Sequence, residues 1–86
     1  MEIHEAPHGI NIVVDTEEAI YIGRFDKTNG FEAVMHDCAE HHIEAGEDTE
    51  AFVKQTAKYG IAVDHKDLTF PTAGVTRVRI LGDIPK

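Results

Sequence analysis

The chain has 86 residues, of which 42% are hydrophobic and 28% are charged, and its formal net charge is −8. This composition excludes a disordered chain, and the length predicts a single domain over residues 1–86 with a small core. The acidic charge disfavours nucleic-acid binding, because an acidic surface repels the phosphate backbone.

The charge is unevenly distributed along the chain. Residues 1–50 carry 13 acidic side chains against 2 basic ones, a net charge of −11, whereas residues 51–86 carry 3 acidic against 6 basic, a net charge of +3. One interpretation is that these charges only keep the protein soluble. The other is that the acidic region of one copy meets the basic region of a second copy, which predicts self-association.

Targeting and redox signals are few. No apolar stretch follows a basic N-terminal start, so no signal peptide is predicted. No apolar run approaches the roughly 20 residues that a membrane span needs, so no membrane partner is predicted. Cys38 is the only cysteine, which excludes an internal disulfide framework. Together these features predict a cytoplasmic protein.

The chain begins with a predicted β-hairpin. Apolar residues alternate over 10–14, and residues 19–25 are β-branched and aromatic, so both segments are predicted strands joined by the polar residues 15–18. Gly23 inside the second strand predicts a bend or a bulge. Residues 26–30 are a predicted turn, because Asn-Gly readily adopts positive φ.

Residues 31–45 fit two structures. As a helix they place Phe31, Val34, Met35, Cys38, Ala39 and Ile43 on one stripe, with Asn29 as cap and Gly46 as the end. As a strand they alternate poorly, but an inner strand need not alternate. Periodicity alone favours the helix.

The second half of the chain predicts a helix and two strands. Asp48 can cap a helix that runs to about residue 59 and ends at Gly60, with Phe52, Val53, Thr56 and Ala57 facing inward. Residues 67–70 and 75–81 are predicted strands, joined by a turn at 71–74. In the last strand Thr76, Val78 and Ile80 share one face, and Val75, Arg77, Arg79 and Leu81 share the other.

Two stretches resemble the Sm-like (LSm) family of small SH3-like barrels: GRFDKTNGFEAVMHDCAE (Gly23–Glu40) and LTFPTAGVTRVRIL (Leu68–Leu81). The resemblance implies an α+β fold with the order β-β-β-α-β-β. It would be a strongly bent antiparallel sheet of 4–5 strands with one helix at about 48–59. Without the resemblance, the alternative is a β-hairpin, two helices (31–45 and 48–59) and a second β-hairpin.

The same resemblance carries functional expectations. The family assembles into rings through edge strands and binds U-rich RNA through a turn, which Asp26 and Asn29 match here. Arg77 and Arg79 share one strand face and could bind the carboxylates of a partner. These four residues are the candidate interaction residues, and the partner is expected to be a second copy or another protein.

The heptapeptide HDCAEHH (residues 36–42) is the candidate chemical site. Cys38, His36 and His42 are the possible metal ligands, but no established zinc signature is present. Acidic neighbours weaken Cys38 as a nucleophile, so it is predicted to pack in the core. We therefore expect a non-catalytic interaction module without a cofactor; the alternatives are a metal-binding protein and an Sm-like RNA-binding protein.

Overall fold

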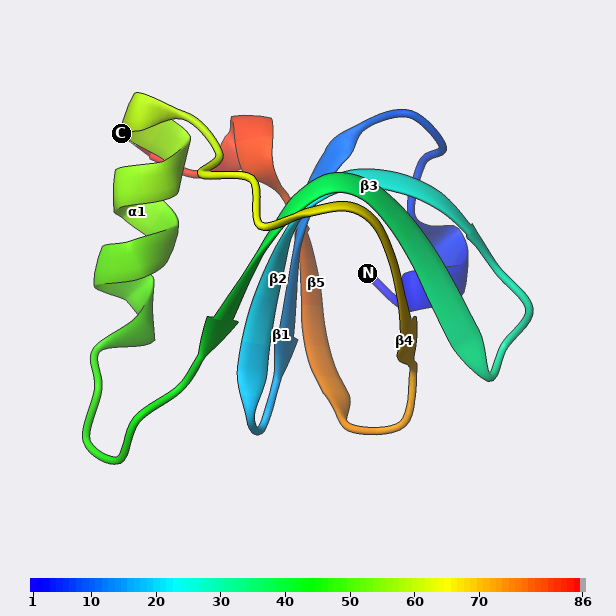
Figure 1. Cartoon of the computed structure of the whole chain (residues 1–86), viewed down its shortest axis with the longest axis horizontal. Helices are drawn as coiled ribbons and strands as arrows, with labels where there is room; N and C mark the ends of the chain where they lie inside the picture. The colour runs from blue at the N-terminus through cyan, green and yellow to red at the C-terminus, as the bar shows by residue number, and fades with distance from the viewer. Residues whose placement is uncertain (86) are drawn as a thin grey trace.

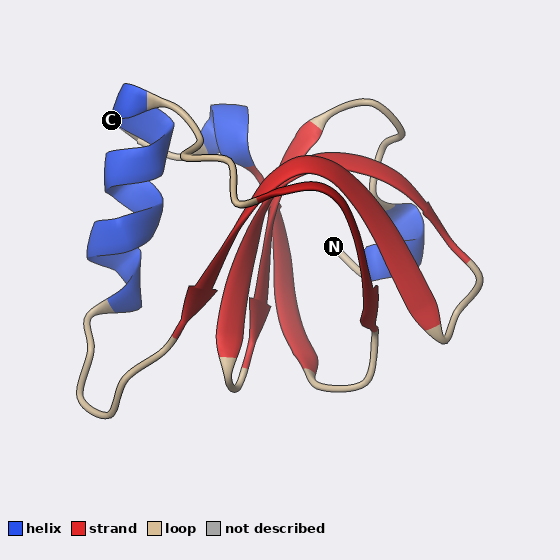
Figure 2. Cartoon of the chain, in the orientation of Figure 1, coloured by secondary structure: helices blue, strands red, loops and turns tan. Residues whose placement is uncertain are grey.

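Five β-strands, one α-helix and two short 3₁₀ helices make up the computed structural model, which describes residues 1–85 (Figure 1, Figure 2). In chain order they are η1 (Ile3–Glu5), β1 (Asn11–Thr16), β2 (Ala19–Thr28), β3 (Glu32–His42), α1 (Thr49–Tyr59), β4 (His65–Pro71), β5 (Val75–Ile80) and η2 (Leu81–Asp83). The predicted α+β class and the order β-β-β-α-β-β are confirmed.

The strands form one antiparallel sheet in the order β4-β3-β2-β1-β5. Its two edge strands, β4 and β5, are consecutive in the chain and are joined by residues 72–74, so the edges converge at that end (Figure 1). Within residues 1–85 no ladder of hydrogen bonds joins β4 to β5. The sheet is therefore neither closed nor strongly curled, and the predicted strongly bent barrel is corrected to an open sheet.

The alternative helix over residues 31–45 is wrong, because this segment contains the inner strand β3, which pairs with β2 and β4. A β-bulge explains why its sequence imitates a helix. Ile22 pairs with Ala39 and Arg24 pairs with His36, so Gly23 faces two residues, Asp37 and Cys38. The extra residue reverses the alternation of faces. Met35 and Cys38 consequently enter the same core although they are three positions apart, which is a helical spacing.

Gly23 is required at this bulge. Asp37 adopts a positive φ of 48°, and a Cβ added at Gly23 would lie 2.3 Å from the Cβ of Cys38 and 2.7 Å from its Cα. Real Cβ atoms do not approach one another so closely, so only glycine fits without a shift of β3. The predicted bend or bulge at Gly23 is confirmed.

Each face of the sheet has its own core. The larger core is built from Ile12, Val14, Phe25, Ala33, Met35, Cys38, Phe70 and Val78. The smaller core lies on the other face, where α1 and η2 cover it, and is built from Val13, Ile20, Ile22, Val53 and Ile84. Neighbouring residues of β1 enter different cores because side chains alternate along a strand.

The helix has the predicted boundaries and inward face. The side chain of Asp48 accepts a hydrogen bond from the amide of Glu50, and Gly60 follows the last turn with a φ of 98°. Val53 and Thr56 are buried, and Phe52 and Ala57 pack against the smaller core. As Figure 1 shows, α1 lies beside one end of the sheet.

Candidate functional site

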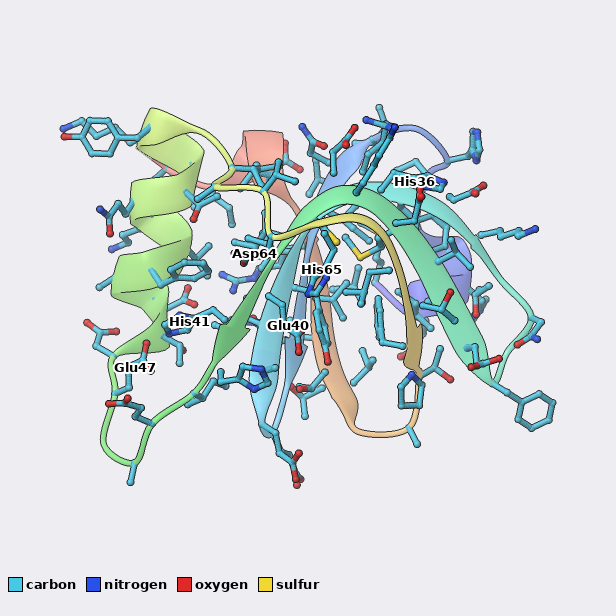
Figure 3. All side chains as sticks on the ribbon, viewed as in Figure 1. His36, Glu40, His41, Glu47, Asp64 and His65 are labelled. Carbon is cyan, nitrogen blue, oxygen red and sulfur yellow. The ribbon has the colours of Figure 1, made fainter. Side chains whose placement is uncertain are left out.

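The heptapeptide at residues 36–42 lies on β3, and its side chains reach separate places (Figure 3). Because neighbouring residues of a strand point to opposite faces, His41 and His42 lie on different sides of the sheet. The residues that are neighbours in the sequence are therefore separated in the structure: the three histidines and Glu40 form contacts in different places, and Cys38 lies in the core.

His36 lies between two carboxylates and forms what we call the His36 cluster (Asp26, His36 and Asp67). Its Nε2 is 2.8 Å from Oδ2 of Asp26, and its Nδ1 is 2.7 Å from Oδ1 of Asp67. The hydrogen bonds to Asp26 and then Asp67 raise the pKa of His36, and the hydrogen bond from His36 lowers the pKa of Asp26. The arrangement favours a protonated imidazole that donates to both carboxylates.

Cys38 is fully buried in the larger core, as predicted. Burial, and next the nearby carboxylate of Glu40, raise the pKa of its thiol to about 11. A thiol with such a pKa is protonated at neutral pH, and the protonated form is a weak nucleophile.

The carboxylate of Glu40 contacts two imidazoles near the end of β3. Its Oε1 is 2.7 Å from Nε2 of His65, and its Oε2 is 3.1 Å from Nε2 of His42. The carboxylate of Asp64 accepts a hydrogen bond from the amide of Glu40. The ladder pairs Glu40 with Tyr21, and burial, then Glu40 and Glu18, raise the pKa of the Tyr21 phenol. Two carboxylates, Glu40 and Glu18, therefore act on the phenol at this end of the sheet.

The side chain of His41 points to the face of the sheet that α1 covers. Its ring stacks on that of Phe52 in α1, with centroids 4.3 Å apart and planes 14° apart, and its Nε2 contacts the carboxylate of Glu47. The hydrogen bond from the amide of Glu44, followed by the one from His41, lowers the pKa of Glu47. This imidazole fixes the loop that leads into α1.

A second charged group joins α1 to β1 and β5; we call it the Arg79 cluster (Asp15, Glu50, Arg77 and Arg79). Arg79 donates to Glu50 at 2.7 Å and 3.0 Å and to Asp15 at 3.0 Å, and Arg77 donates to Asp15 at 2.7 Å. The hydrogen bond from Arg79 lowers the pKa of Glu50. The two arginines predicted to bind a partner's carboxylates are thus engaged with carboxylates of their own chain.

The two residues that match the Sm-like turn also have internal contacts. Oδ1 of Asn29 accepts from the amides of Phe31 and Glu32, both at 2.9 Å, and so stabilises the β2–β3 turn. Asp26 belongs to the His36 cluster, and His8 lies 3.4 Å from its carboxylate.

The three candidate metal ligands are not brought together. Cys38 is in the core, His36 lies between Asp26 and Asp67, and His42 contacts Glu40. Within residues 1–85 no group of three or more His, Cys, Asp or Glu side chains is arranged to hold a metal ion.

Sequence reasoning missed the carboxylate partners of the histidines and arginines. Asp67 and Glu50 lie 31 and 29 positions away from the residues they contact. A ladder that pairs β3 with β4 places His36 opposite Asp67, so the correct register would have found the first contact. The contact between Arg79 and Glu50 depends on where α1 packs on the sheet, and no local sequence pattern predicts this position.

Comparison of the chain with protein-family models, with curated proteins and with solved structures found no match. In the part of the chain that the structure describes, no helix is long and apolar enough to cross a membrane.

Proposed function

We propose that this protein is a non-catalytic interaction module that self-associates through the outer edge of β4. The observation that carries the proposal is that β4 is an edge strand whose outer backbone groups have no partner within residues 1–85. An exposed edge is a template on which a strand of a second chain can pair.

The hydrogen-bond pattern identifies the available groups. The amide of Thr72 donates to the carbonyl of Phe31 at 2.9 Å, and this pair continues the β3–β4 register. Antiparallel pairing alternates, so Leu68 and Phe70 direct their backbone groups to β3, while Asp67 and Thr69 direct theirs outward. The backbone groups of Pro71 also point outward, and this position suits a residue without an amide hydrogen.

The other edge of the sheet is less accessible. The amino group of Met1 lies 3.4 Å from the carbonyl of Val78 on β5. β5 also has an irregular register with β1 between Asp15 and Thr16. Bulges and covering segments weaken an edge as a pairing template, so β4 is the better candidate for contact with a second copy.

The sequence of β4 suits pairing with itself. In an antiparallel pair of two β4 strands centred on Leu68, Asp67 of each copy lies opposite Thr69 of the other. No like charges then face each other, and the arrangement has the twofold symmetry that is commonest among dimers. Docking of a different protein on the same edge would use the same backbone groups.

The test is sedimentation analysis of the full chain and of two variants at position 69, whose side chain is exposed. Thr69→Pro removes an outward amide hydrogen without removing a bond to β3, whereas Thr69→Val keeps the amide and is the matched control. We expect a dimer for the parent and for Thr69→Val, and a monomer for Thr69→Pro with an unchanged fold by circular dichroism.

A parent protein that is monomeric at both low and high salt would exclude self-association. A dimer that persists in Thr69→Pro would place the interface elsewhere on the chain. The Sm-like resemblance, RNA binding, metal binding and the cytoplasmic location stay predictions from the sequence.

A further inference from the structure

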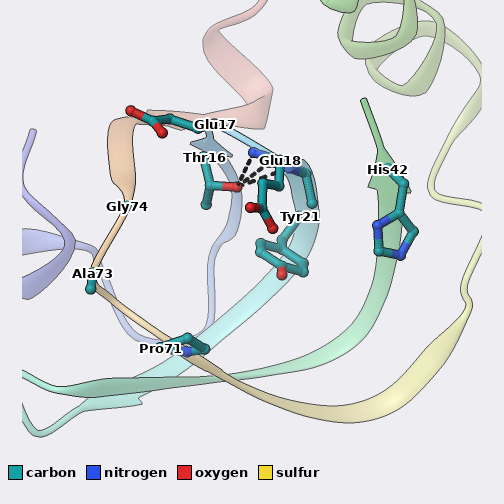
Figure 4. A pocket seen from close by; sticks show the side chains of 9 residues that line it. Thr16, Glu17, Glu18, Tyr21, His42, Pro71, Ala73 and Gly74 are labelled. Atoms are coloured by element: carbon teal, nitrogen blue, oxygen red, sulfur yellow. Dashed lines mark hydrogen bonds between the residues drawn. The ribbon is translucent and has the colours of Figure 1, made fainter. Parts of the chain in front are cut away.

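A pocket opens where the two edges of the sheet converge (Figure 4). It lies between the β1–β2 turn and the β4–β5 turn, and its cavity volume is about 250 Å³. Drug-sized ligands occupy about 300–1,000 Å³, so this pocket suits a single side chain rather than a larger molecule.

One wall of the pocket is an aromatic ring that is held in place. Tyr21 lines the pocket, and its ring stacks on Phe70 with centroids 4.4 Å apart and planes 18° apart. Phe70 is buried in the larger core. An aromatic ring whose orientation is fixed by packing presents its π electrons to a cation without an ordering cost.

The opposite rim carries carboxylates. Glu17 and Glu18 line the pocket from the β1–β2 turn, and within residues 1–85 neither side chain forms an ion pair or a hydrogen bond. Thr16 stabilises this turn: its hydroxyl oxygen accepts from the amides of Glu18 and Ala19, and its O–H group donates to the carbonyl of Ala19. Figure 4 shows Glu18 above the ring of Tyr21.

The pocket has no permanent positive charge among its walls. None of its nine lining residues is Lys or Arg, and the one basic group among them, the imidazole of His42, contacts the carboxylate of Glu40 at 3.1 Å. The carboxylate of Glu40, which contacts His42 and His65, also contributes with Glu18 to the raised pKa of Tyr21. An aromatic face and two unpaired carboxylates together favour a cationic group.

We propose that this pocket binds the guanidinium group of an arginine side chain presented by a protein partner. A guanidinium is planar, stacks on aromatic faces and donates to carboxylates in pairs, whereas an ammonium is a compact and strongly hydrated charge. The ring of Tyr21 and the carboxylates of Glu17 and Glu18 supply both kinds of contact. Pro71 of β4 lines the pocket, but the groups that would contact the guanidinium lie on the β1–β2 hairpin, so the site can be tested in a monomer as well as in a dimer.

The experiment is an NMR titration of the full chain with N-acetyl-arginine methylamide, N-acetyl-lysine methylamide and the uncharged isostere N-acetyl-citrulline methylamide. We expect the arginine compound to shift resonances of residues 16–21 and 71–74 with a dissociation constant on the order of 1 mM, which is usual for a few exposed contacts. We expect the lysine compound to bind at least about threefold more weakly and the citrulline compound to cause no saturable shift.

Three variants locate the site. Glu18→Gln should weaken arginine binding about threefold or more, and Tyr21→Leu should abolish it. Asp83→Asn is the matched control, because it removes the same charge from an exposed carboxylate in η2, on the other side of the sheet, and should change binding less than about twofold. Glu18 is exposed on a turn, so its variant tests the site even if Tyr21→Leu impairs folding.

Three results would overturn the proposal. Equal binding of citrulline would show that charge is not recognised, and equal binding of lysine would show that a guanidinium is not selected. Equal losses in Glu18→Gln and Asp83→Asn would show attraction to the net charge only. None of these results bears on the dimer, which is measured separately by the Thr69 variants.

Discussion

The His36 cluster and the Arg79 cluster perform similar structural work with different chemistry. Both tie neighbouring elements together through imidazole or guanidinium contacts to carboxylates. The Arg79 cluster lies beneath α1, where Arg79 is 19% exposed and Asp15 is 13% exposed. The His36 cluster lies where no helix covers the sheet, and Asp67 there is 71% exposed. The covered cluster therefore uses a charge that persists at every ordinary pH, and the uncovered one uses a charge that titrates.

The two clusters should respond differently to pH. Arginine does not deprotonate in proteins, so the attachment of α1 to β1 and β5 is constant above the pKa of its carboxylates. Histidine changes charge near neutral pH, so the junction of β2, β3 and β4 is the part of the sheet that weakens as the solution becomes basic.

The largest effect is expected from Gly23→Ala, which disturbs the bulge beside the His36 cluster and leaves the Arg79 cluster alone. The new Cβ would lie 2.3 Å from the Cβ of Cys38 and 2.7 Å from its Cα, so backbone atoms would have to move. We expect a loss of about 3 kcal/mol in the free energy of unfolding by urea. Gly82→Ala is the control, because no atom lies within 4 Å of its added Cβ. Equal losses in the two variants would contradict the steric explanation.

The next effect is expected from Arg79→Met, which removes the central cation of the Arg79 cluster. It leaves the mostly buried Asp15 with Arg77 alone, so we expect a loss of about 1–3 kcal/mol in unfolding free energy. Arg77→Met removes a side chain that is 52% exposed and should cost less than about 1 kcal/mol. The same urea titration measures both, and a larger loss for Arg77→Met would reverse the assigned order of the two arginines.

The smallest effect is expected from His36→Gln, and it should depend on pH. The pKa of His36 is raised in the folded protein, so its contribution is complete below the unfolded pKa near 6.5 and is lost as pH rises through the folded value. The pKa of Asp26 is lowered, so its contribution requires a pH above the unfolded value near 3.8. The stability difference between parent and variant should therefore be largest between about pH 4 and 6.5 and should shrink towards pH 9. Arg79→Met should show no such decline over the basic part of this range, which thermal unfolding at a series of pH values would reveal.

The parts of the fold that local chemistry determines were predictable from the sequence. The cap at Asp48, the end at Gly60 and the bulge opposite Gly23 follow from backbone geometry within a few residues, and the structure has all three. The strand at β3 was not predictable from periodicity, because its bulge converts a two-residue alternation into an apparent helical spacing.

The site was less predictable than the fold. The sequence identified His36, Cys38 and His42 as neighbours, but strand geometry separates neighbours and joins residues of different strands. Arg77 and Arg79 were correctly placed on one face, yet their carboxylate partners come from β1 and α1. The pocket beside Tyr21 was missed because it is formed by two turns that are about 55 residues apart in the chain.

Asp37 is one extra residue in β3, and it exchanges the two faces of the sheet for every side chain that follows it. Before it, odd-numbered residues such as Met35 face the larger core; after it, even-numbered residues such as Cys38 do. Deletion of Asp37 would remove the bulge opposite Gly23, would leave the second register shift between Phe25 and Lys27, and would turn Glu40 and His42 towards the helix and His41 away from it. The number of residues in this strand therefore decides which face of the sheet each side chain after the bulge occupies.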